Sequence, residues 1–365
     1  MWKFFIKRKT KMKNKSQNPI ITVIGCGMMG SSITWPAAYN GCKIRYVGSP
    51  LDGEIIAHAR ATGEHLTLKR PIPAGTEFYT VDEMEKALEG ADLSICGVSS
   101  FGLDWYLDYV IPRLPDGVPV LSISKGMIHL GEGKMISYPE KMEEVAAACG
   151  KKNIDFCAVG GPCTSYELAD LDPSCVTFCG RKIELLREIR DLFEAPYYHV
   201  SLSTDVRGVE CAVALKNAYA LGVSLAIGMS YKREGREFEH YNSQAALFGQ
   251  AVREMRILLD LCGGHPDNIE LGAGDLYVTV FGGRTRKIGT LLGTGMSFKD
   301  AMEALKGVTL ESIAIAGRTV EAAKTLESMG VIKADDLPLL YHIGRLLDNE
   351  TGIDVPWKKF EKEVY

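Results

Sequence analysis

A glycine-rich turn between two short β-branched runs constrains the fold of this chain more than any other feature. Residues 20–24 (Ile-Ile-Thr-Val-Ile) predict a strand that leads directly into Gly25-Cys26-Gly27-Met28-Met29-Gly30. A stretch compatible with a helix then extends to Gly41, and residues 43–47 predict a second strand. Strand, glycine turn, helix and strand within about 30 residues are the context in which a G-x-G-x-x-G pattern indicates dinucleotide binding.

Each glycine of this turn meets its own physical requirement. Gly25 permits the tight turn, Gly27 lets the backbone approach a pyrophosphate, and Gly30 lets the helix pack closely on the strand. The N-terminus of the following helix offers unpaired N–H groups and the positive end of its dipole to phosphate oxygens. We therefore expect a dinucleotide cofactor to bind at Gly25, Gly27, Met28, Met29 and Gly30.

Further apolar runs in the first half of the chain predict a mostly parallel sheet. They alternate with helical or loop segments, which is typical of a doubly wound α/β domain. The additional predicted strands are residues 93–98, 118–123, 154–159 and 174–179.

The pattern changes to long helices after about residue 202. Residues 205–229 contain no proline, and either Ser203 or Thr204 can cap the N-terminus of a helix there. Further helices are predicted over residues 243–261 and 309–329. We therefore divide the chain into a basic disordered tail (1–18), a Rossmann-like dinucleotide-binding domain (19–201) and an all-helical substrate domain (202–365).

Composition excludes other classes of protein. Of the 365 residues, 46% are hydrophobic, which is enough apolar material for two packed domains. Seven Lys and Arg fall within residues 1–18, so the remaining 35 against 46 Asp and Glu leave the rest of the chain at −11. A body this acidic binds a phosphate backbone poorly, so we expect no nucleic-acid partner.

Targeting signals and cysteine usage predict a cytoplasmic protein without a membrane span. The apolar stretch near the N-terminus is too short for a secretory signal, and the longest predicted helix has Lys216 and Asn217 near its middle. The ten cysteines include no C-x-x-C pair, and no histidine falls at zinc-finger spacing. We therefore expect reduced thiols and no metal site.

Lys216 lies on the apolar stripe of the predicted helix over residues 205–229. The stripe recurs every three or four positions, at Val209, Val213, Ala220, Val223 and Ile227. One interpretation is a lysine that snorkels, with its ammonium at the rim of the apolar surface. The other is a partly desolvated general acid, with Asn217 beside it positioning a substrate.

Together with other short motifs, this helix resembles the catalytic helix of the NAD(P)-dependent glycerol-3-phosphate dehydrogenase family. The motifs follow the family's order and span most of residues 20–315. They are the glycine turn, Ser124-Lys125-Gly126, Gly161-Pro162 with Glu167, Val213-Ala214-Leu215-Lys216-Asn217, Gly274-Asp275-Leu276 with Thr279, Gly283-Arg284, and Gly307-Val308 with Glu311. The family's Rossmann-like domain and helical domain, the latter like the C-terminal domain of 6-phosphogluconate dehydrogenase, agree with the division above.

The chain departs from the family pattern at three places. Thr285 follows Arg284 where the family usually has asparagine, and Met28-Met29 stand where the glycine turn usually has an aromatic residue. The Asn-x-x-Tyr-Leu-Pro loop of the family's first domain is not recognisable in residues 64–70. These differences bear on the geometry of the substrate and cofactor sites, not on the class of reaction.

The resemblance implies a role for each motif residue. Lys216 would donate a proton to the carbonyl oxygen of dihydroxyacetone phosphate, and Lys125 would place positive charge near the developing alkoxide. Asp275 would orient Lys216, and Arg284 would hold the substrate phosphate with its planar fork. The implied substrate-binding residues are Lys125, Gly161, Lys216, Asn217, Asp275, Arg284 and Thr285. The implied cofactor-binding residues beyond the glycine turn are Ser49, Phe101, Lys125, Arg284 and Glu311.

Structural interpretations of the same residues stay open at this point. Arg284 belongs to the run Arg284-Thr285-Arg286-Lys287, which a solvated basic loop also explains. Asp275 can be a helix N-cap, and Lys125 can be part of a surface turn.

The sequence leaves the choice between NAD and NADP open. An NAD enzyme often has Asp or Glu about 20 residues after the glycine turn, where it accepts hydrogen bonds from the ribose. Here the second strand ends in Val47-Gly48-Ser49-Pro50, and the first acid is Asp52. Ser49 is compatible with either cofactor, and the basic Arg45 is near it in sequence.

We therefore expect a homodimeric oxidoreductase that interconverts sn-glycerol 3-phosphate and dihydroxyacetone phosphate with NAD or NADP. One alternative is a related reductase of another small carbonyl compound, such as a different phosphorylated ketose or a ketopantoate-like acid. Dehydrogenases of 6-phosphogluconate and hydroxyisobutyrate have an asparagine four residues after the catalytic lysine, where this chain has Ala220. A second alternative is a non-catalytic dinucleotide sensor, which has no use for a lysine on an apolar face.

Overall fold

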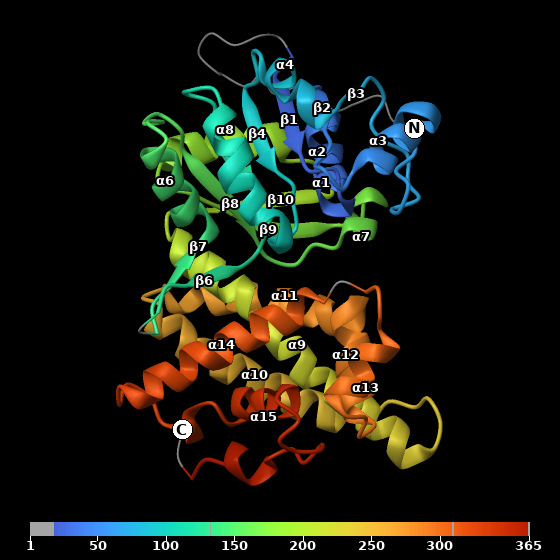
Figure 1. The fold of residues 1–365 in the computed structure, drawn as a ribbon, viewed down its shortest axis with the longest axis vertical. Coiled ribbons are helices and arrows are strands. Elements are labelled where there is room, and N and C mark those ends of the chain that lie inside the picture. Colours follow the sequence, from blue (N-terminus) through green and yellow to red (C-terminus); the bar gives the residue numbers. More distant parts are fainter. Residues whose placement is uncertain (1–17, 132, 309, 364–365) are drawn as a thin grey trace.

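The computed structural model describes residues 18–131, 133–308 and 310–363, without the side chain of Glu311. It has two parts (Figure 1). The upper part in that view is an α/β domain, and the lower part is a helical domain. The expected basic tail lies outside the described residues, apart from Asn18.

One eight-stranded sheet forms the centre of the first domain. Its spatial order is β10-β9-β8-β5-β4-β1-β2-β3, and every neighbouring pair is parallel except the antiparallel pair of β8 and β9. This confirms the mostly parallel, doubly wound sheet expected from the sequence. In that order, the strands are β10 (Tyr198–Ser203), β9 (Ser174–Cys179), β8 (Phe156–Gly160), β5 (Val120–Ser122), β4 (Leu93–Cys96), β1 (Ile20–Ile24), β2 (Lys43–Val47) and β3 (Glu77–Tyr79).

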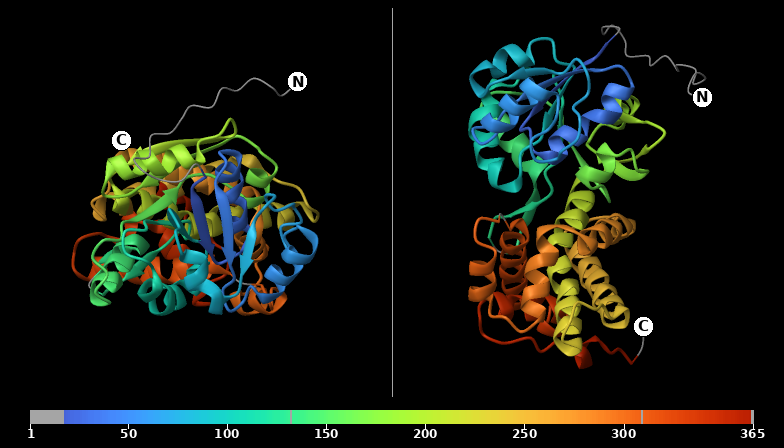
Figure 2. Two further views of the ribbon diagram at one scale, coloured as in Figure 1. Left: turned by 90° about the horizontal axis from the view of Figure 1, so that it is seen from above. Right: turned by 90° about the vertical axis from the view of Figure 1, so that its right-hand side faces the viewer.

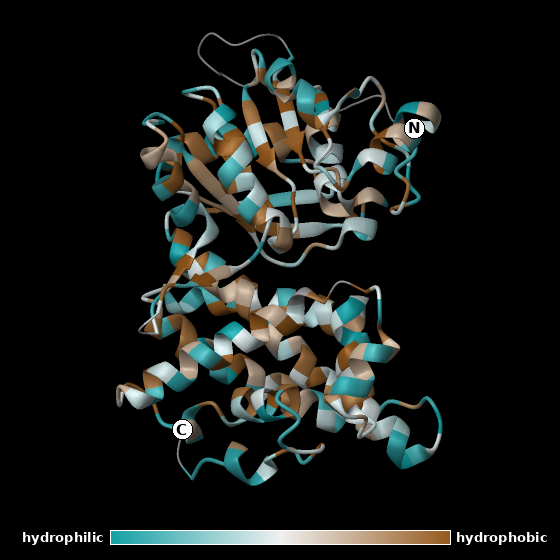
Figure 3. Cartoon of the chain, viewed as in Figure 1, coloured by the Kyte–Doolittle hydropathy of each residue, from teal (hydrophilic) through white to brown (hydrophobic). Residues whose placement is uncertain are grey.

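The central strands β1, β4 and β5 are almost completely buried and mostly apolar because helices cover both faces of the sheet. Ile21, Val23 and Ile24 of β1 are all fully buried. Figure 3 shows the hydrophobic residues concentrated in these central strands. The helices of this domain are α1 (Met28–Ser32), α2 (Thr34–Tyr39), α3 (Gly53–Thr62), α4 (Met84–Leu88), α5 (Leu103–Trp105), α6 (Tyr138–Ala148), α7 (Ser165–Ala169) and α8 (Ile183–Phe193).

The predicted strand positions agree with the structure to within about two residues, with identifiable exceptions. The strand predicted at 118–123 is only β5, since Pro119 has no N–H to give to a ladder. The strand predicted at 93–98 ends at Cys96, where Gly97 meets the glycine turn. Four strands were not predicted: β3, β10, and the hairpin of β6 (Met127–His129) and β7 (Met135–Ser137).

A single long helix, α9 (Val206–Glu234), forms the centre of the second domain. The right view of Figure 2 shows α9 running the length of this domain with other helices around it. These helices are α10 (Tyr241–Leu261), α11 (Ile269–Phe281), α12 (Gly283–Gly293), α13 (Phe298–Ala304), α14 (Glu311–Ser328) and α15 (Pro338–Leu347).

The two ends of α9 have clear capping signals. Its N-cap is Asp205, whose carboxylate accepts a hydrogen bond from the backbone N–H of Gly208 at 2.9 Å. The expected cap at Ser203 or Thr204 was therefore wrong, because β10 extends to Ser203 and the chain turns only after it. Gly235 ends the helix with a left-handed φ of 67°, which glycine adopts without strain.

By length and composition alone, α9 is apolar enough to cross a membrane. However, 89% of its most apolar window is buried inside the protein. This burial is typical of the central helix of a folded domain.

The two domains contact each other through α9 and the β6–β7 hairpin. Val209 packs on Gly160 at the end of β8, where a Cβ atom would lie only 2.5 Å from a Val209 methyl group. Gly133 in the hairpin turn packs on Leu326 of α14 in the same way. The carboxyl ends of the sheet strands therefore face the first turns of α9.

Candidate active site

The glycine turn follows β1 at the carboxyl edge of the sheet. Gly25 has a φ of 94°, a region that side chains with a Cβ rarely adopt. A Cβ on Gly30 would lie 2.4 Å from the carbonyl oxygen of Gly25, so this position needs glycine for close packing. A Cβ on Gly27 would have no protein atom within 4 Å, so the turn is open on this side.

Two side chains that the sequence analysis missed hold this turn at Cys26. The carboxylate of Asp52 accepts hydrogen bonds from the backbone N–H groups of Cys26, at 2.9 Å, and Ser49, at 2.8 Å. The Nε2 atom of His65 donates to the carbonyl oxygen of Cys26 at 2.8 Å, while Nδ1 accepts from the N–H of Leu68. Burial lowers the pKa of His65, in keeping with this neutral form. No short-range motif reveals such long-range contacts.

Ser49 follows β2 and is partly exposed at the same edge of the sheet. Arg45 does not serve this position, because its guanidinium forms an ion pair with Glu77 and donates to the carbonyl groups of Ala87 and Glu89. Arg45 is the nearby base that could bind the 2′-phosphate of NADP, and its guanidinium is therefore already engaged elsewhere.

Lys125, Lys216 and Asp275 meet at the junction of the two domains. The Nζ atom of Lys125 donates to Oδ2 of Asp275 at 2.6 Å, and Nζ of Lys216 donates to Oδ1 at 2.5 Å. Lys125 also donates to the carbonyl oxygen of Gly161 at 2.8 Å. The Asp275 side chain is fully buried, and the lysine side chains are 16% and 13% exposed.

Four separate elements bring these residues together. Lys125 follows β5 and Gly161 follows β8, so both lie at the carboxyl edge of the sheet. Lys216 lies in α9, and Asp275 lies in α11, which crosses α9 where a Cβ on Gly272 would approach Ala212. Topologically, this is where open α/β sheets bind ligands.

The geometry excludes the structural interpretations of these three residues. Asp275 lies inside α11 and is not an N-cap, and Lys125 is not a solvated turn residue because it is ion-paired to a buried carboxylate. Lys216 does not snorkel to an open rim, since its ammonium is also held by Asp275.

Arg284 and Thr285 begin α12, next to the end of α11. Cβ atoms on Gly289 and Gly293 of α12 would contact the carbonyl oxygens of Leu221 and Leu225, so the two helices run in the same direction. When this register is extended by one turn toward the N-termini of both helices, the first turn of α12 lies beside Asn217 of α9. Thr285 is buried, whereas Arg284 is exposed and forms no ion pair within the described part of the chain.

The remaining predicted residues lie at the edges of this arrangement. Phe101 follows β4 and is 56% exposed, and Met28 and Met29 begin α1 in partly buried positions. Glu167 accepts a hydrogen bond from Thr164 at 2.6 Å and does not reach the lysines. The side chain of Glu311 lies outside what the structure describes.

Glu210 is a further ionisable residue near the site that the sequence analysis did not find. Its side chain is fully buried on α9, and neither carboxyl oxygen has a hydrogen-bond partner among the described residues. Burial raises the pKa of Glu210 to about 8, opposed by the nearby positive charge of Lys125. Glu210 was missed because no local motif marks it, and the side chains that surround it are known only from the fold.

Comparison with known proteins identifies the family. The sequence model of the N-terminal domain of NAD-dependent glycerol-3-phosphate dehydrogenase matches residues 20–185, and that of the C-terminal domain matches residues 205–356. The chain belongs to this family. The expected family and two-domain fold are therefore confirmed.

Individual relatives agree with this assignment. An NADP(+)-dependent glycerol-3-phosphate dehydrogenase of Archaeoglobus fulgidus is 31% identical over 79% of this chain and 84% of the relative. A glycerol-3-phosphate dehydrogenase [NAD(P)+] of Desulfotalea psychrophila is 28% identical over 92% and 90%. A solved glycerol-3-phosphate dehydrogenase structure of Plasmodium falciparum superimposes with a TM-score of 0.79 over 95% of this chain and 97% of that one. At 18% identity, this last likeness shows the fold alone.

Among the residues that the structure describes, no three His, Cys, Asp or Glu side chains lie close enough together to hold a metal ion.

Proposed function

We propose that this chain interconverts sn-glycerol 3-phosphate and dihydroxyacetone phosphate with NAD or NADP, using Lys216 as the general acid and base. The observation that best supports this function is the pair of lysines held by one buried carboxylate beside the carboxyl edge of the sheet. A protein that only senses a dinucleotide has no need for this costly buried cluster. The family assignment supports the same substrate and cofactor class.

The residues at the glycine turn fit a dinucleotide. The open side of Gly27 leaves room for a pyrophosphate against the backbone, and the N-terminus of α1 provides free N–H groups there. When bound, the reduced nicotinamide supplies the hydride for the carbonyl carbon. Asp52 and His65 keep the turn in its binding shape by holding Cys26.

The proton comes from Lys216 in this mechanism. Its ammonium donates to the carbonyl oxygen as negative charge develops there, and the neutral amine is later recharged from water. Lys125 stays protonated and stabilises the developing alkoxide. Asp275 keeps both lysines in place, and the three groups together have one net positive charge, which favours an anionic substrate.

Arg284, Asn217 and Thr285 form the proposed phosphate site. The register of α12 on α9 supports this grouping because it places their helix segments side by side. A guanidinium offers two parallel N–H donors to phosphate oxygens, and an amide and a hydroxyl can complete the set.

The decisive experiment is an assay of NADH and NADPH oxidation with dihydroxyacetone phosphate and a panel of other carbonyl compounds. We expect the highest kcat/KM with dihydroxyacetone phosphate, well above ketopantoate and unphosphorylated dihydroxyacetone. Preference for another carbonyl compound would instead support a related reductase. Nucleotide binding without turnover of any substrate would support the sensor.

We also propose a homodimer in the cytoplasm. Three exposed aromatic residues on α10 and α11, Tyr241, Tyr277 and Phe281, offer an apolar surface for a second copy, and all ten cysteines are free. Light scattering of the purified protein measures the oligomeric state directly. A monomer at micromolar concentration would contradict the dimer.

A further inference from the structure

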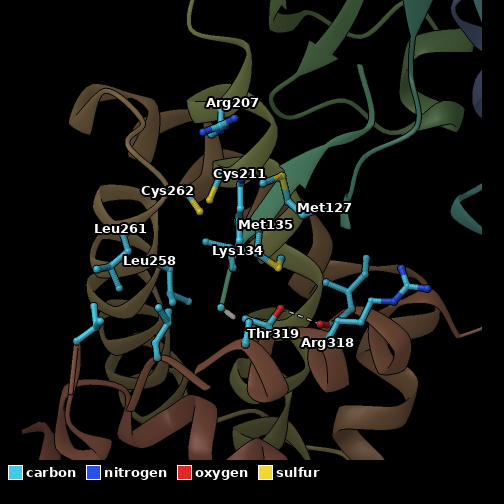
Figure 4. Close-up of a pocket in the computed structure, with 17 residues that line it drawn as sticks. Met127, Lys134, Met135, Arg207, Cys211, Leu258, Leu261, Cys262, Arg318 and Thr319 are labelled. Atoms are coloured by element: carbon cyan, nitrogen blue, oxygen red, sulfur yellow. Dashed lines mark hydrogen bonds between the residues drawn. The ribbon is translucent and has the colours of Figure 1, made fainter. Parts of the chain in front are cut away.

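A cavity of about 190 Å³ lies between α9, α10, α14 and the β6–β7 hairpin (Figure 4). Most of its lining is apolar, but it includes the thiols of Cys211 and Cys262. Cys211 is buried on α9, and Cys262 is partly exposed at the C-terminus of α10. Figure 4 shows the two sulfur atoms facing each other on the side of the cavity near Arg207.

The two thiols differ in a way that suits thiol–disulfide chemistry. A hydrogen bond between the two thiols is the largest cause that shifts their pKa values in opposite directions. This bond and the guanidinium of Arg207 lower the pKa of Cys262, whereas the same bond and burial raise the pKa of Cys211. Cys262 is therefore the better and more accessible nucleophile.

Another neighbouring pair provides a contrast within the same protein. Cys157 and Cys179 lie on the antiparallel strands β8 and β9, but both are buried in the sheet core. Burial raises the pKa of Cys157 to about 12 and that of Cys179 above its usual range. Neither thiol of this pair can readily attack an oxidant in solution.

We propose that Cys211 and Cys262 are a reversible dithiol site that reacts with small disulfides of the glutathione type. The Cys262 thiolate attacks one sulfur of the small disulfide, which forms a mixed disulfide and releases one thiolate. Cys211 loses its proton and attacks the Cys262 sulfur, which closes the intramolecular disulfide and releases the second thiolate. Overall, the two protein thiols lose two electrons and two protons, and one small disulfide is reduced to two thiols.

The cross-link would join the start of the helix that contains Lys216 to the end of α10. Cys211 lies five residues before Lys216 on α9. A disulfide between Cys211 and Cys262 therefore ties the first turns of α9 to a neighbouring helix of the same domain. The redox chemistry of these two thiols does not depend on the reaction proposed for Lys216.

The test equilibrates the full chain in glutathione buffers of increasing oxidised fraction, then blocks free thiols and digests without reduction. Trypsin separates the cysteines into peptides 208–216 and 257–284, so mass spectrometry detects the cross-link directly. We expect this cross-linked peptide to rise with the oxidised fraction and to disappear after dithiothreitol. Cys149 and Cys175, which are exposed, serve as internal controls that form mixed disulfides only.

Two variants test the assigned roles. Cys211→Ser should trap glutathione on Cys262 because no resolving thiol remains, whereas Cys262→Ser should leave Cys211 unmodified. Melting temperatures close to wild type in reducing buffer establish that each variant is folded. A wild-type protein that accumulates a stable glutathione adduct on Cys262 without the cross-link would overturn the proposal. Modification of Cys211 in the Cys262→Ser variant at the wild-type rate would also overturn it.

Discussion

One buried carboxylate that holds two ammonium groups is the decisive residue-level feature of this protein. Each oxygen of the Asp275 carboxylate accepts a hydrogen bond from a different lysine, so one carboxylate fixes both ammonium groups. Removing the carboxylate would leave two like charges together in a poorly solvated place. We therefore regard Asp275 as the residue that makes the two-lysine site possible.

Lys216→Ala should lower the turnover of dihydroxyacetone phosphate by about 10²–10⁴-fold, because a positioned general acid contributes an effect of that size. Nucleotide affinity should stay near wild type, since Lys216 lies on α9 and the glycine turn lies after β1. Steady-state kinetics and NADH titration measure the two effects separately. Lys299→Ala, on an exposed part of the helical domain, is the matched control. Near-wild-type turnover in Lys216→Ala at saturating substrate would refute its role.

The buried Glu210 predicts a pH dependence of stability. Burial raises the pKa of Glu210 to about 8 in the folded protein, whereas the ordinary pKa of a glutamate side chain is 4.5. Between these values the folded state keeps a proton that the unfolded state has lost, so this residue lowers stability as pH rises. The slope from one such proton is at most about 1.4 kcal/mol per pH unit.

Glu210→Gln should therefore remove this slope, because glutamine is similar in shape and does not titrate. The difference in melting temperature, variant minus wild type, should therefore increase from pH 5 to pH 8. Glu350→Gln, at an exposed position, is the control and should leave the pH profile unchanged. Parallel profiles for wild type and Glu210→Gln would contradict the buried, protonated state.

At the residue scale, the sequence predicts part of the site. Lys216 stands out because it interrupts an apolar helical stripe, and a lysine there needs an explanation. Lys125 and Asp275 were found only through the resemblance, since nothing local distinguishes them from surface residues. Asp52 and His65 escaped notice because their partners become neighbours only after the sheet forms.

At the scale of elements, the glycine turn separates binding from folding. Gly27 faces open space, whereas Gly30 is packed against the backbone of Gly25. A side chain added at Gly27 should therefore impair cofactor binding, whereas a side chain added at Gly30, three residues later, should lower the stability of the protein.

Gly27→Val should abolish NADH binding while leaving the melting temperature within a few degrees of wild type, because its branched side chain occupies the pyrophosphate position. Gly30→Ala should instead destabilise the protein, by about 1–3 kcal/mol, because its methyl group overlaps a backbone oxygen. Isothermal titration with NADH and thermal denaturation measure both variants. Unchanged affinity in a folded Gly27→Val protein would show that this turn does not bind the cofactor.

Elements with a strong local pattern were predictable, and elements defined by their partners were not. The first strand, glycine turn and second strand were predicted correctly because a β-branched run, three spaced glycines and a second strand-forming run follow one another within a short stretch of chain. The hairpin of β6 and β7 has only three residues in each strand, and its role is to contact α9 and α14. Strand β10 alternates buried and exposed residues at the edge of the sheet, and its neighbour β9 supplies its hydrogen bonds.

At the scale of the whole molecule, neither domain contains all the residues of the proposed site. The first domain provides the glycine turn, Lys125 and the Gly161 carbonyl group, and the second provides Lys216, Asp275 and the start of α12. The direct ion pair between Lys125 and Asp275 therefore links the domains and also fixes both residues in the proposed site. The two-domain division follows from the change of sequence period near residue 202, but this cross-domain contact does not.

The position of Arg284 in the assembled molecule leads to the prediction that best separates the proposed substrate from other carbonyl compounds. Arg284 is exposed at the start of α12, and its guanidinium is not engaged by any described residue. A charge-assisted hydrogen bond to phosphate contributes about 1.5–3 kcal/mol, or roughly 10- to 100-fold in kcat/KM. Arg284→Ala should show at least this loss with dihydroxyacetone phosphate, and Arg284→Lys a smaller one.

The comparison that decides the role of Arg284 uses unphosphorylated dihydroxyacetone at fixed ionic strength. A residue that binds the phosphate affects this substrate little, so the ratio of the two kcat/KM values should fall in both variants. Equal losses on both substrates would place Arg284 at the cofactor or in the fold instead. Thr285→Asn, which introduces the residue usual in the family, should keep or raise activity with the phosphorylated substrate. A large loss in that variant would mean that the buried Thr285 has shaped this end of α12 for a different substrate.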